Sequence, residues 1–135
     1  MIKLIVGHKG SGKTKTLIEQ INQTAKTAKG NIVCVEKAMK LTYDIDSSVR
    51  LIDIDLYNVS GYDAFYGFVA GLYASNYDLT DVYVDGILKI GGRNLEELGA
   101  TFDRLEVLNQ KNEVNMVFTV SCNLEDLPDS VKKYL

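Results

Sequence analysis

A glycine-rich segment near the start of the chain, GHKGSGKT at residues 7–14, combines residue types that suit the binding of an anion. Its three glycines let the backbone turn so that successive N–H groups can point at one centre. Lys13 adds a positive charge and Thr14 adds a hydroxyl. Because closely spaced lysines repel each other, a bound negative charge would stabilise the arrangement. The segment therefore predicts a site for phosphate groups, and a chance glycine-rich turn is the alternative.

The spacing within this segment is specific. It fits the pattern G-x-x-x-x-G-K-[ST] at every fixed position, after an apolar run at residues 2–6 and before a helical pattern at 13–28. The start of that helix adds the positive end of its dipole. We expect the Lys13 ammonium to reach the β- and γ-phosphates of a nucleotide and the Thr14 hydroxyl to bind Mg²⁺. The predicted nucleotide-binding residues are Gly7, His8, Lys9, Gly10, Ser11, Gly12, Lys13, Thr14 and Lys15.

Strand and helix patterns alternate along the rest of the chain. This alternation favours a parallel sheet with helices on both faces. We therefore expect an α/β fold, a three-layer α-β-α sandwich with a mainly parallel sheet of about five strands. Within the second predicted helix the small residues are expected to form one face that allows close helix packing. The predicted strands lie at 2–6, 32–35, 50–54, 82–85 and 114–120, and the predicted helices at 13–28, 61–76 and 94–112, the last capped by Asn94.

Residues 38–55 allow two arrangements. Apolar and polar residues alternate from Met39 to Ile45, as they do in a half-exposed strand, and a turn then leads to the strand at 50–54. In the first arrangement the two strands form a β-hairpin within 38–55. In the second, only residues 50–54 join the main sheet.

The segment at 7–14, the apolar strand that ends at Asp85 and the strand–helix order together resemble the P-loop NTPase superfamily. The roughly seventy residues between Lys13 and Asp85 resemble the RecA-like and AAA+ branch, in which another strand lies between the two motifs. The resemblance implies that 7–14 is the Walker A motif and that 79–85 is the Walker B strand. It also implies that Asp85 holds Mg²⁺ through water, beside Thr14. A simple Asp-Gly turn after a strand is the alternative.

Hydrolysis is where the sequence departs from this branch. The branch often carries a glutamate directly after the Walker B acid, and Gly86 occupies that position here. Glu36 follows the second strand, as the catalytic glutamate does in some secretion and pilus-retraction ATPases of the branch. The resemblance thus implies Glu36 and Lys13 as catalytic residues, with Glu36 polarising water. A solvated glutamate paired with Lys37 is the alternative.

Two hydroxyl residues, Thr119 and Ser121, share one face at the end of the last strand. They are similar to the sensor position that reads the γ-phosphate in this branch, and a structural pair is the alternative. The nucleotide itself follows by elimination. GTPases of the superfamily usually carry N-K-x-D and D-x-x-G, whereas residues 109–112 lack the aspartate and residues 85–88 lack the second glycine. ATP with Mg²⁺ is therefore favoured over GTP.

Composition limits the remaining possibilities. The chain has 135 residues, which suits one nucleotide-binding domain over 1–135, and a net charge of -3 does not indicate a nucleic-acid partner. Two cysteines and one histidine are too few for a disulfide framework or a C-x-x-C metal site. No apolar run approaches the roughly 20 residues of a membrane span, and the apolar start is too short for a signal peptide. The expected location is cytoplasmic.

The predicted function is an ATP–Mg²⁺ binding protein with weak ATPase activity, coupled to a macromolecular partner or to a homo-oligomer. A non-hydrolysing regulatory module and a small-molecule kinase are the alternatives. Tyrosines are concentrated in one segment, where an exposed stripe would favour such an interface and a buried stripe would be core. These are Tyr57, Tyr62, Tyr66, Tyr73 and Tyr77.

Overall fold

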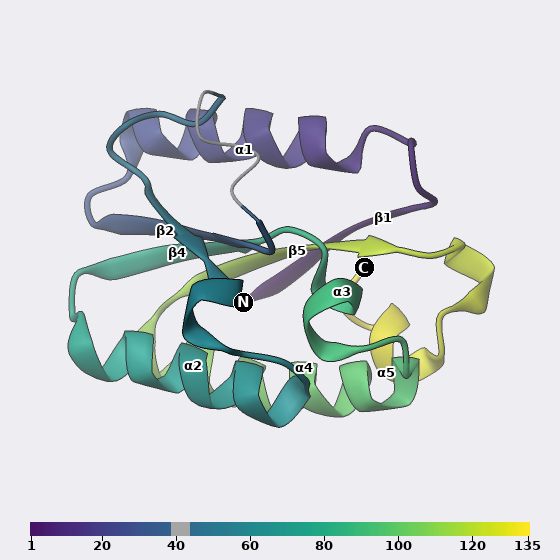
Figure 1. Cartoon of the computed structure of the whole chain (residues 1–135). Coiled ribbons are helices and arrows are strands. Elements are labelled where there is room, and N and C mark those ends of the chain that lie inside the picture. The colour runs from purple at the N-terminus through teal and green to yellow at the C-terminus, as the bar shows by residue number, and fades with distance from the viewer. Residues whose placement is uncertain (39–43) are drawn as a thin grey trace.

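The computed structural model describes residues 1–38 and 44–135. Within these ranges five strands form one sheet in the order β1-β5-β4-β2-β3, and every neighbouring pair is parallel (Figure 1). This confirms the predicted parallel sheet. The strands are β1 (Ile2–Gly7), β2 (Asn31–Glu36), β3 (Arg50–Asp53), β4 (Leu79–Val84) and β5 (Asn115–Ser121).

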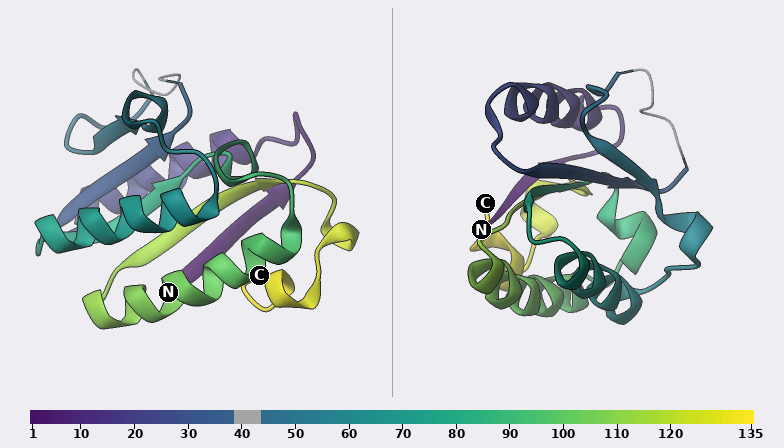
Figure 2. Two further views of the ribbon diagram at one scale, coloured as in Figure 1. Left: turned by 60° about the horizontal axis from the view of Figure 1, so that its bottom comes forward. Right: turned by 90° about the vertical axis from the view of Figure 1, so that its left-hand side faces the viewer.

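The helices divide unequally between the two faces of the sheet. Helix α1 (Lys13–Thr27) lies over one face, and the other helices cover the opposite face (Figures 1 and 2). The predicted three-layer α-β-α arrangement is confirmed. The remaining helices are α2 (Tyr62–Ser75), α3 (Ile87–Gly91), α4 (Leu95–Asn112) and α5 (Asp129–Lys132), and two single 3₁₀ turns, η1 (Ile54–Tyr57) and η2 (Leu124–Asp126), complete the described elements.

Alternation along the strands separates two apolar cores. Ile32 and Cys34 of β2 pack with Leu17 and Ile21 of α1, whereas Val33 and Val35 belong to the larger core beneath α2 and α4. Because side chains alternate with a period of two, Glu36 continues the Ile32–Cys34 series onto the α1 face. Leu17 and Ile21, on the face of α1 that meets the sheet, are fully buried.

Strand β3 covers part of the segment for which two arrangements were considered, residues 38–55. It pairs with β2 in parallel, with Val33 opposite Arg50 and Glu36 opposite Asp53, so residues 50–53 belong to the main sheet. The hairpin prediction depends on residues 39–43, which lie outside the described residues.

Because all the strands are parallel, their carboxyl ends meet at one edge of the sheet. In spatial order the strands end at Gly7, Ser121, Val84, Glu36 and Asp53. We call this the carboxyl edge. The loop at residues 8–12 leaves the sheet here and leads into α1, so every residue with a predicted catalytic or metal-binding role lies on a segment at this edge.

Helix α2 differs from the sequence-based expectation in one respect. The face formed by Ala64, Gly67, Gly71 and Ala74 is exposed, so the predicted close packing across it is wrong. The helix instead buries its larger side chains, Tyr62, Phe65, Val69 and Tyr73. Among the tyrosines, Tyr66 is half-buried, and Tyr57 and Tyr77 are exposed.

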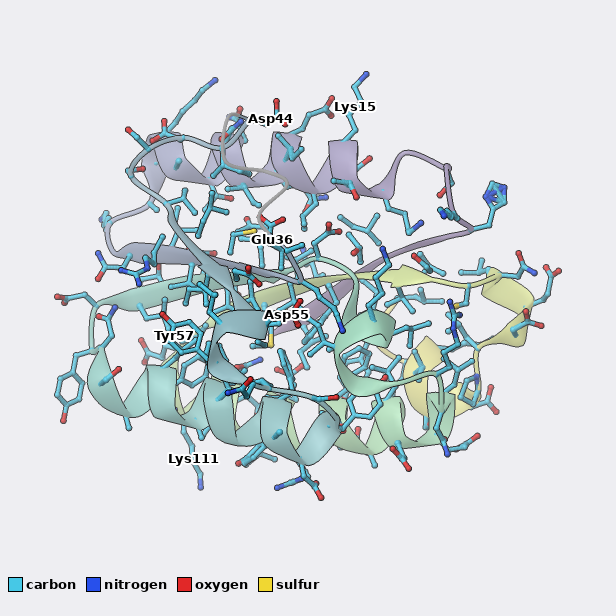
Figure 3. All side chains as sticks on the ribbon, viewed as in Figure 1. Lys15, Glu36, Asp44, Asp55, Tyr57 and Lys111 are labelled. Atoms are coloured by element: carbon cyan, nitrogen blue, oxygen red, sulfur yellow. The ribbon has the colours of Figure 1, made fainter. Side chains whose placement is uncertain are left out.

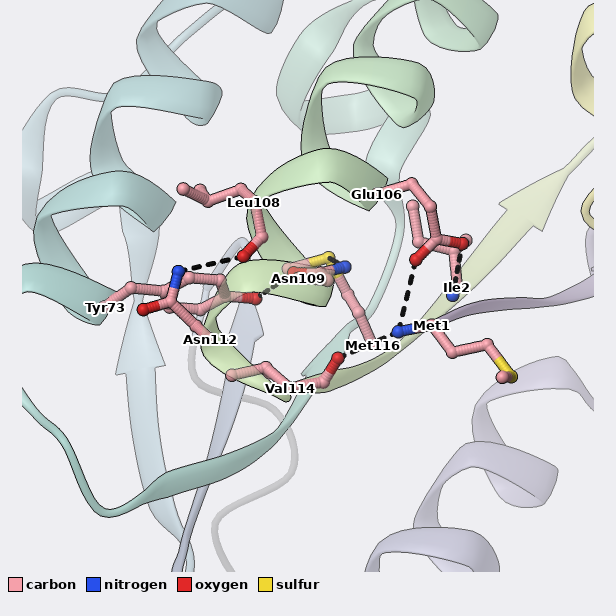
Figure 4. Close-up of polar contacts among 9 residues, drawn as sticks. All are labelled: Met1, Ile2, Tyr73, Glu106, Leu108, Asn109, Asn112, Val114 and Met116. Atoms are coloured by element: carbon pink, nitrogen blue, oxygen red, sulfur yellow. Dashed lines mark hydrogen bonds and ion pairs between the residues drawn. The ribbon is translucent and has the colours of Figure 1, made fainter.

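A buried polar contact joins α2, α4 and β5 on the larger core. The Tyr73 hydroxyl donates to Asn109 Oδ1, and Asn109 Nδ2 lies 3.7 Å from Met116 Sδ (Figure 4). Burial, together with the nearby charge of Glu106, raises the pKa of Tyr73, so its hydroxyl stays a donor. This contact fixes both helices on the sheet, away from the carboxyl edge. Within the described residues, no helix is long and apolar enough to cross a membrane.

Candidate functional site

The loop between β1 and α1 is a tight turn that depends on left-handed backbone. Gly10 has φ +84° and Gly12 has φ +88°, a region that residues with a Cβ rarely adopt. The Ser11 amide donates to the His8 carbonyl at 3.1 Å, which closes the turn. Gly12 directly precedes the first turn of α1. The loop therefore places its backbone at the N-terminal end of a 15-residue helix.

The three glycines of the loop serve different purposes. A Cβ on Gly7 would overlap the Ser11 side chain, so this position must be small for the turn to close on itself. A Cβ on Gly10 or Gly12 would meet nothing within 4 Å. Those two glycines satisfy the backbone conformation and leave open space in front of the loop.

Lys13 is unusually buried for a lysine, with 9% of its surface exposed. Its Nζ donates to the His8 carbonyl oxygen at 2.8 Å, so the side chain turns back across the loop. The ammonium is thus held beside the backbone of residues 8–12. This contact uses one of the three N–H donors of the ammonium. An anion can therefore bind the same charged group.

Three segments that are distant in the sequence meet beside the loop. The Thr14 hydroxyl donates a long hydrogen bond, 3.4 Å, to Asp85 Oδ1. The Thr119 hydroxyl donates to the same carboxylate oxygen at 2.7 Å and accepts from the Gly86 amide at 2.7 Å. The structure therefore brings together Thr14 and Asp85, the two residues predicted to bind metal.

Glu36 ends β2, which is separated from β1 and the loop by β5 and β4, and it lies on the α1 face of the sheet. It is 2% exposed, and Figure 3 shows it between α1 and the sheet. Burial, and secondarily the negative charges of Glu36 and Asp85, raise the pKa of the Cys34 thiol, which places both carboxylates near that residue. The Asp85 amide also donates to the Val35 carbonyl at 2.9 Å. Glu36 and Asp85 thus follow adjacent strands at the carboxyl edge.

Other predicted residues lie apart from this group. Lys15 is exposed and points away from the sheet (Figure 3), and His8 and Lys9 are exposed on the loop. Lys37, considered as a partner for Glu36, has its Nζ 3.8 Å from Asp55 Oδ1. That contact lies between two half-exposed side chains and contributes little.

The donor set at the carboxyl edge suits Mg²⁺. A threonine hydroxyl and a carboxylate within hydrogen-bond reach match a cation that keeps several waters and takes its other ligands from phosphate. Across residues 1–38 and 44–135, no group of three or more His, Cys, Asp or Glu side chains is arranged to hold a metal ion. A cation beside Asp85 could take its remaining oxygen ligands from water or from a bound ligand.

A separate hollow lies away from the loop, within the described part of the chain. It measures about 480 Å³, lies between β3, η1 and α2 and contains none of the predicted site residues. Its walls include Ile52, Tyr57, Phe68 and Leu72, with Arg50 at its rim. A loop that binds phosphate through its backbone needs no deep pocket, so the distance of this hollow from the loop does not count against a phosphate site there.

Sequence reasoning named Thr119 only as a sensor candidate and missed its contact with Asp85. The signal was available in part. Thr119 lies near the end of one predicted strand and Asp85 ends another, and each directly follows a residue of the larger core. What could not be obtained from the sequence is that β4 and β5 are neighbours, with Val84 opposite Phe118.

No protein-family model matches the chain, and no curated protein matches it. Among solved structures, the chain is similar to the flagellar accessory protein FlaH from Methanocaldococcus jannaschii, with a TM-score of 0.61 and 16% sequence identity. The alignment covers 98% of this chain and 65% of that one, so the chain spans just under two thirds of the FlaH structure. Likeness at this level of identity concerns the fold. The parallel α/β arrangement is compatible with the P-loop NTPase fold.

Proposed function

We propose that this chain binds ATP with Mg²⁺ at residues 7–14 and hydrolyses it slowly, as a P-loop NTPase of the RecA-like and AAA+ branch. One observation carries the proposal. The Thr14 hydroxyl, at the start of α1, lies 3.4 Å from the carboxylate of Asp85, 71 residues further along the chain. The Walker A and Walker B motifs of this superfamily require that meeting of a helix start and a strand end.

The loop is suited to the phosphates for a physical reason. Gly10 and Gly12 have left-handed backbone and open space in front of them, and the N-terminal end of α1 adds its positive dipole. Lys13 Nζ is held at the His8 carbonyl, within the loop. A charged phosphate oxygen is a stronger acceptor than that carbonyl, so we expect the ammonium to exchange one for the other on binding.

Mg²⁺ would be held by Thr14 directly and by Asp85 through water. It would supply positive charge next to the phosphate oxygens when bound. The chain contributes the hydroxyl and the carboxylate and holds them on two different elements, α1 and the end of β4. Their hydrogen bond of 3.4 Å brings the two groups face to face.

Glu36 is the residue we assign to water activation. Gly86 has φ +75°, so a glutamate at that position would strain the backbone, and the usual acid of the branch is disfavoured there. Glu36 ends the adjacent strand and lies on the α1 face with Asp85. Its role would be to orient a water molecule and accept a proton from it.

A non-hydrolysing nucleotide-binding module is the second candidate. Two observations favour it: glycine replaces the usual acid at position 86, and the Glu36 side chain is only 2% exposed. A buried carboxylate needs access to water before it can act as a base. Phosphate release distinguishes the two candidates, because only an ATPase releases phosphate with time.

We also propose that residues 1–135 act as one nucleotide-binding domain with a macromolecular partner or a second copy of the chain. Leu56 and Tyr57 support this, because they are 73% and 54% exposed side by side at the end of η1. Large exposed apolar side chains are enriched where proteins meet.

Calorimetric titration with ATP and Mg²⁺ tests nucleotide binding. The wild-type chain should bind saturably, and Lys13→Ala should lose detectable binding, because the phosphates lose their only buried cation on the loop. Lys15→Ala is the matched control: it removes the same charge two residues later from a side chain that points away, and it should change affinity less than about threefold. Equal affinity of Lys13→Ala and wild type would contradict the proposal.

A further inference from the structure

The Thr119 hydroxyl has a fully determined pair of hydrogen bonds. A backbone amide can only donate, so Thr119 Oγ1 accepts from Gly86 N, at 2.7 Å. The hydroxyl proton then goes to the carboxylate of Asp85, at 2.7 Å. Thr119 is 1% exposed, so water does not compete strongly for either bond. One buried side chain therefore holds both residues of the Asp85-Gly86 turn.

These bonds restrict how the Asp85 carboxylate can turn. Its Oδ1 accepts from Thr119 at 2.7 Å and from Thr14 at 3.4 Å. The two donors hold this oxygen toward β5 and α1, which limits rotation of the carboxylate. A carboxylate that binds a cation through water depends on such orientation, because the cation's water shell has a fixed geometry.

The same turn leads into α3, which is packed into the protein. Gly86 directly precedes the helix with φ +75°, and Ile87 and Leu88 of the helix are buried. At the far end, the Ile90 carbonyl accepts from the Gly61 amide at 2.9 Å. The Tyr62 hydroxyl donates to the Gly92 carbonyl at 2.6 Å. A change at Gly86 is thus connected, through α3, to the start of α2.

We propose that Thr119 is a positioning residue, which orients Asp85 for the magnesium–nucleotide complex and ties that carboxylate to α3 through the Gly86 amide. This inference rests on the proposed function. It differs from the sensor role suggested by the sequence, because the single proton of the hydroxyl is given to Asp85 rather than to a phosphate. Ser121, two residues later on the same face, has no such contact with Asp85 in the described part of the chain.

Two substitutions test the proposal. Thr119→Val keeps the shape of the side chain and removes the hydroxyl, whereas Thr119→Ser keeps the hydroxyl. Calorimetric titration with ATP is run with Mg²⁺ and with EDTA. Thr119→Val should weaken binding about tenfold or more with Mg²⁺ and less than about twofold without it, as expected when an outer partner of a metal-binding carboxylate is lost. Thr119→Ser should stay within about threefold of wild type in both titrations, and so should the control Thr101→Val, which removes the hydroxyl of a buried threonine of α4 that donates to the Glu97 carbonyl.

A second measurement uses the protein without nucleotide. Hydrogen exchange of the Gly86 amide, followed by NMR, should be about fivefold faster in Thr119→Val than in wild type, the factor implied by loss of one net hydrogen bond. Thr119→Ser should restore slow exchange. This measurement does not depend on nucleotide binding, and Thr119→Ala, which also lacks the hydroxyl, serves if the valine variant fails to fold.

The outcomes separate this inference from the proposed function. If wild type binds no nucleotide, the proposed function fails and the magnesium part of the inference fails with it. If wild type binds and Thr119→Val changes both titrations equally, Thr119 is structural and only this inference is overturned. Unchanged exchange of the Gly86 amide in Thr119→Val would overturn the link to α3.

Discussion

The two halves of the candidate site are built in opposite ways. The loop at residues 7–14 is continuous in the sequence, largely exposed, and depends on backbone conformation. The other half, Glu36, Asp85 and Thr119, comes from the ends of three strands and depends on side chains, two of which are buried. We call the second half the strand-end group. The first half can be recognised from spacing alone, whereas the second exists only once the strand order is set.

The two halves also differ in charge. The loop contributes Lys13 and the N-terminal end of α1, and the strand-end group contributes the carboxylates of Glu36 and Asp85. The negative charge of the strand-end group attracts a cation, and the positive charge within the loop attracts an anion. A ligand that carries both, a phosphate chain with a divalent cation, satisfies the two halves together. Predictions that affect one half and spare the other test whether this division is real.

The largest expected effect is on hydrolysis. Glu36→Gln keeps the size of the side chain and removes the proposed base, so phosphate release should fall by about 100-fold or more, while ATP affinity changes little. Continuous measurement of phosphate release checks the expected fall in rate, and calorimetry checks that ATP affinity is kept.

The control for that variant is Asp55→Asn. It removes an exposed carboxylate that is paired with Lys37 in the segment after β3, and it should leave the rate unchanged. If Glu36→Gln releases phosphate as fast as wild type, Glu36 is not the base. If wild type itself releases none, the non-hydrolysing module is the better description.

Next in size is the effect on the cation. Asp85→Asn should weaken ATP binding about 10- to 100-fold with Mg²⁺ and leave binding in EDTA almost unchanged, because the loop still binds the phosphates. Asp81→Asn, on the same strand, is the control, since Asp81 accepts from Thr80 at the opposite end of β4. Titrations with and without Mg²⁺ measure the difference. Equal loss in both would mean that the two halves do not act separately.

Much of the fold could be predicted because the signals are local. Apolar runs marked the strands, the Asn94 cap marked the start of α4, and its Oδ1 accepts from the amides of Glu96 and Glu97 at 3.1 Å. Helix α3 was not predicted, because five residues are too few to show a helical period. The exposed small-residue face of α2 was misjudged because small side chains permit close packing without requiring it.

The candidate site likewise divides into a part that local sequence predicts and a part that depends on strand order. The loop and its place before α1 followed from residue types and spacing. The contact between Thr119 and Asp85 depends on β4 lying beside β5, and no local pattern encodes that adjacency. Similarly, the position of Glu36 beside the end of β4 follows from the pairing of β2 with β4 rather than from its neighbours in the chain.

A smaller effect, on stability, is expected where the loop closes on itself. Gly7→Ala adds a Cβ that overlaps the Ser11 side chain, so the free energy of unfolding should fall by about 1–3 kcal/mol. Urea denaturation measures this. The double variant Gly7→Ala with Ser11→Gly removes the overlapping atoms and should recover most of the loss attributable to overlap. If it recovers none, the cost at position 7 has another origin than crowding by Ser11.

The smallest expected effect compares two glycine substitutions, one in each half, by their cost in stability and by their effect on ATP affinity. Gly12 and Gly86 both have positive φ, +88° and +75°, so alanine at either should cost about 1 kcal/mol of unfolding free energy by urea denaturation. Their effects on ATP affinity should differ, since the Cβ at position 12 enters the open space in front of the loop, whereas at position 86 it meets the Lys89 side chain at 3.6 Å. Gly12→Ala should therefore weaken ATP binding in EDTA, and Gly86→Ala should not. If both variants lost affinity equally, the open space in front of the loop would not be where the phosphates bind.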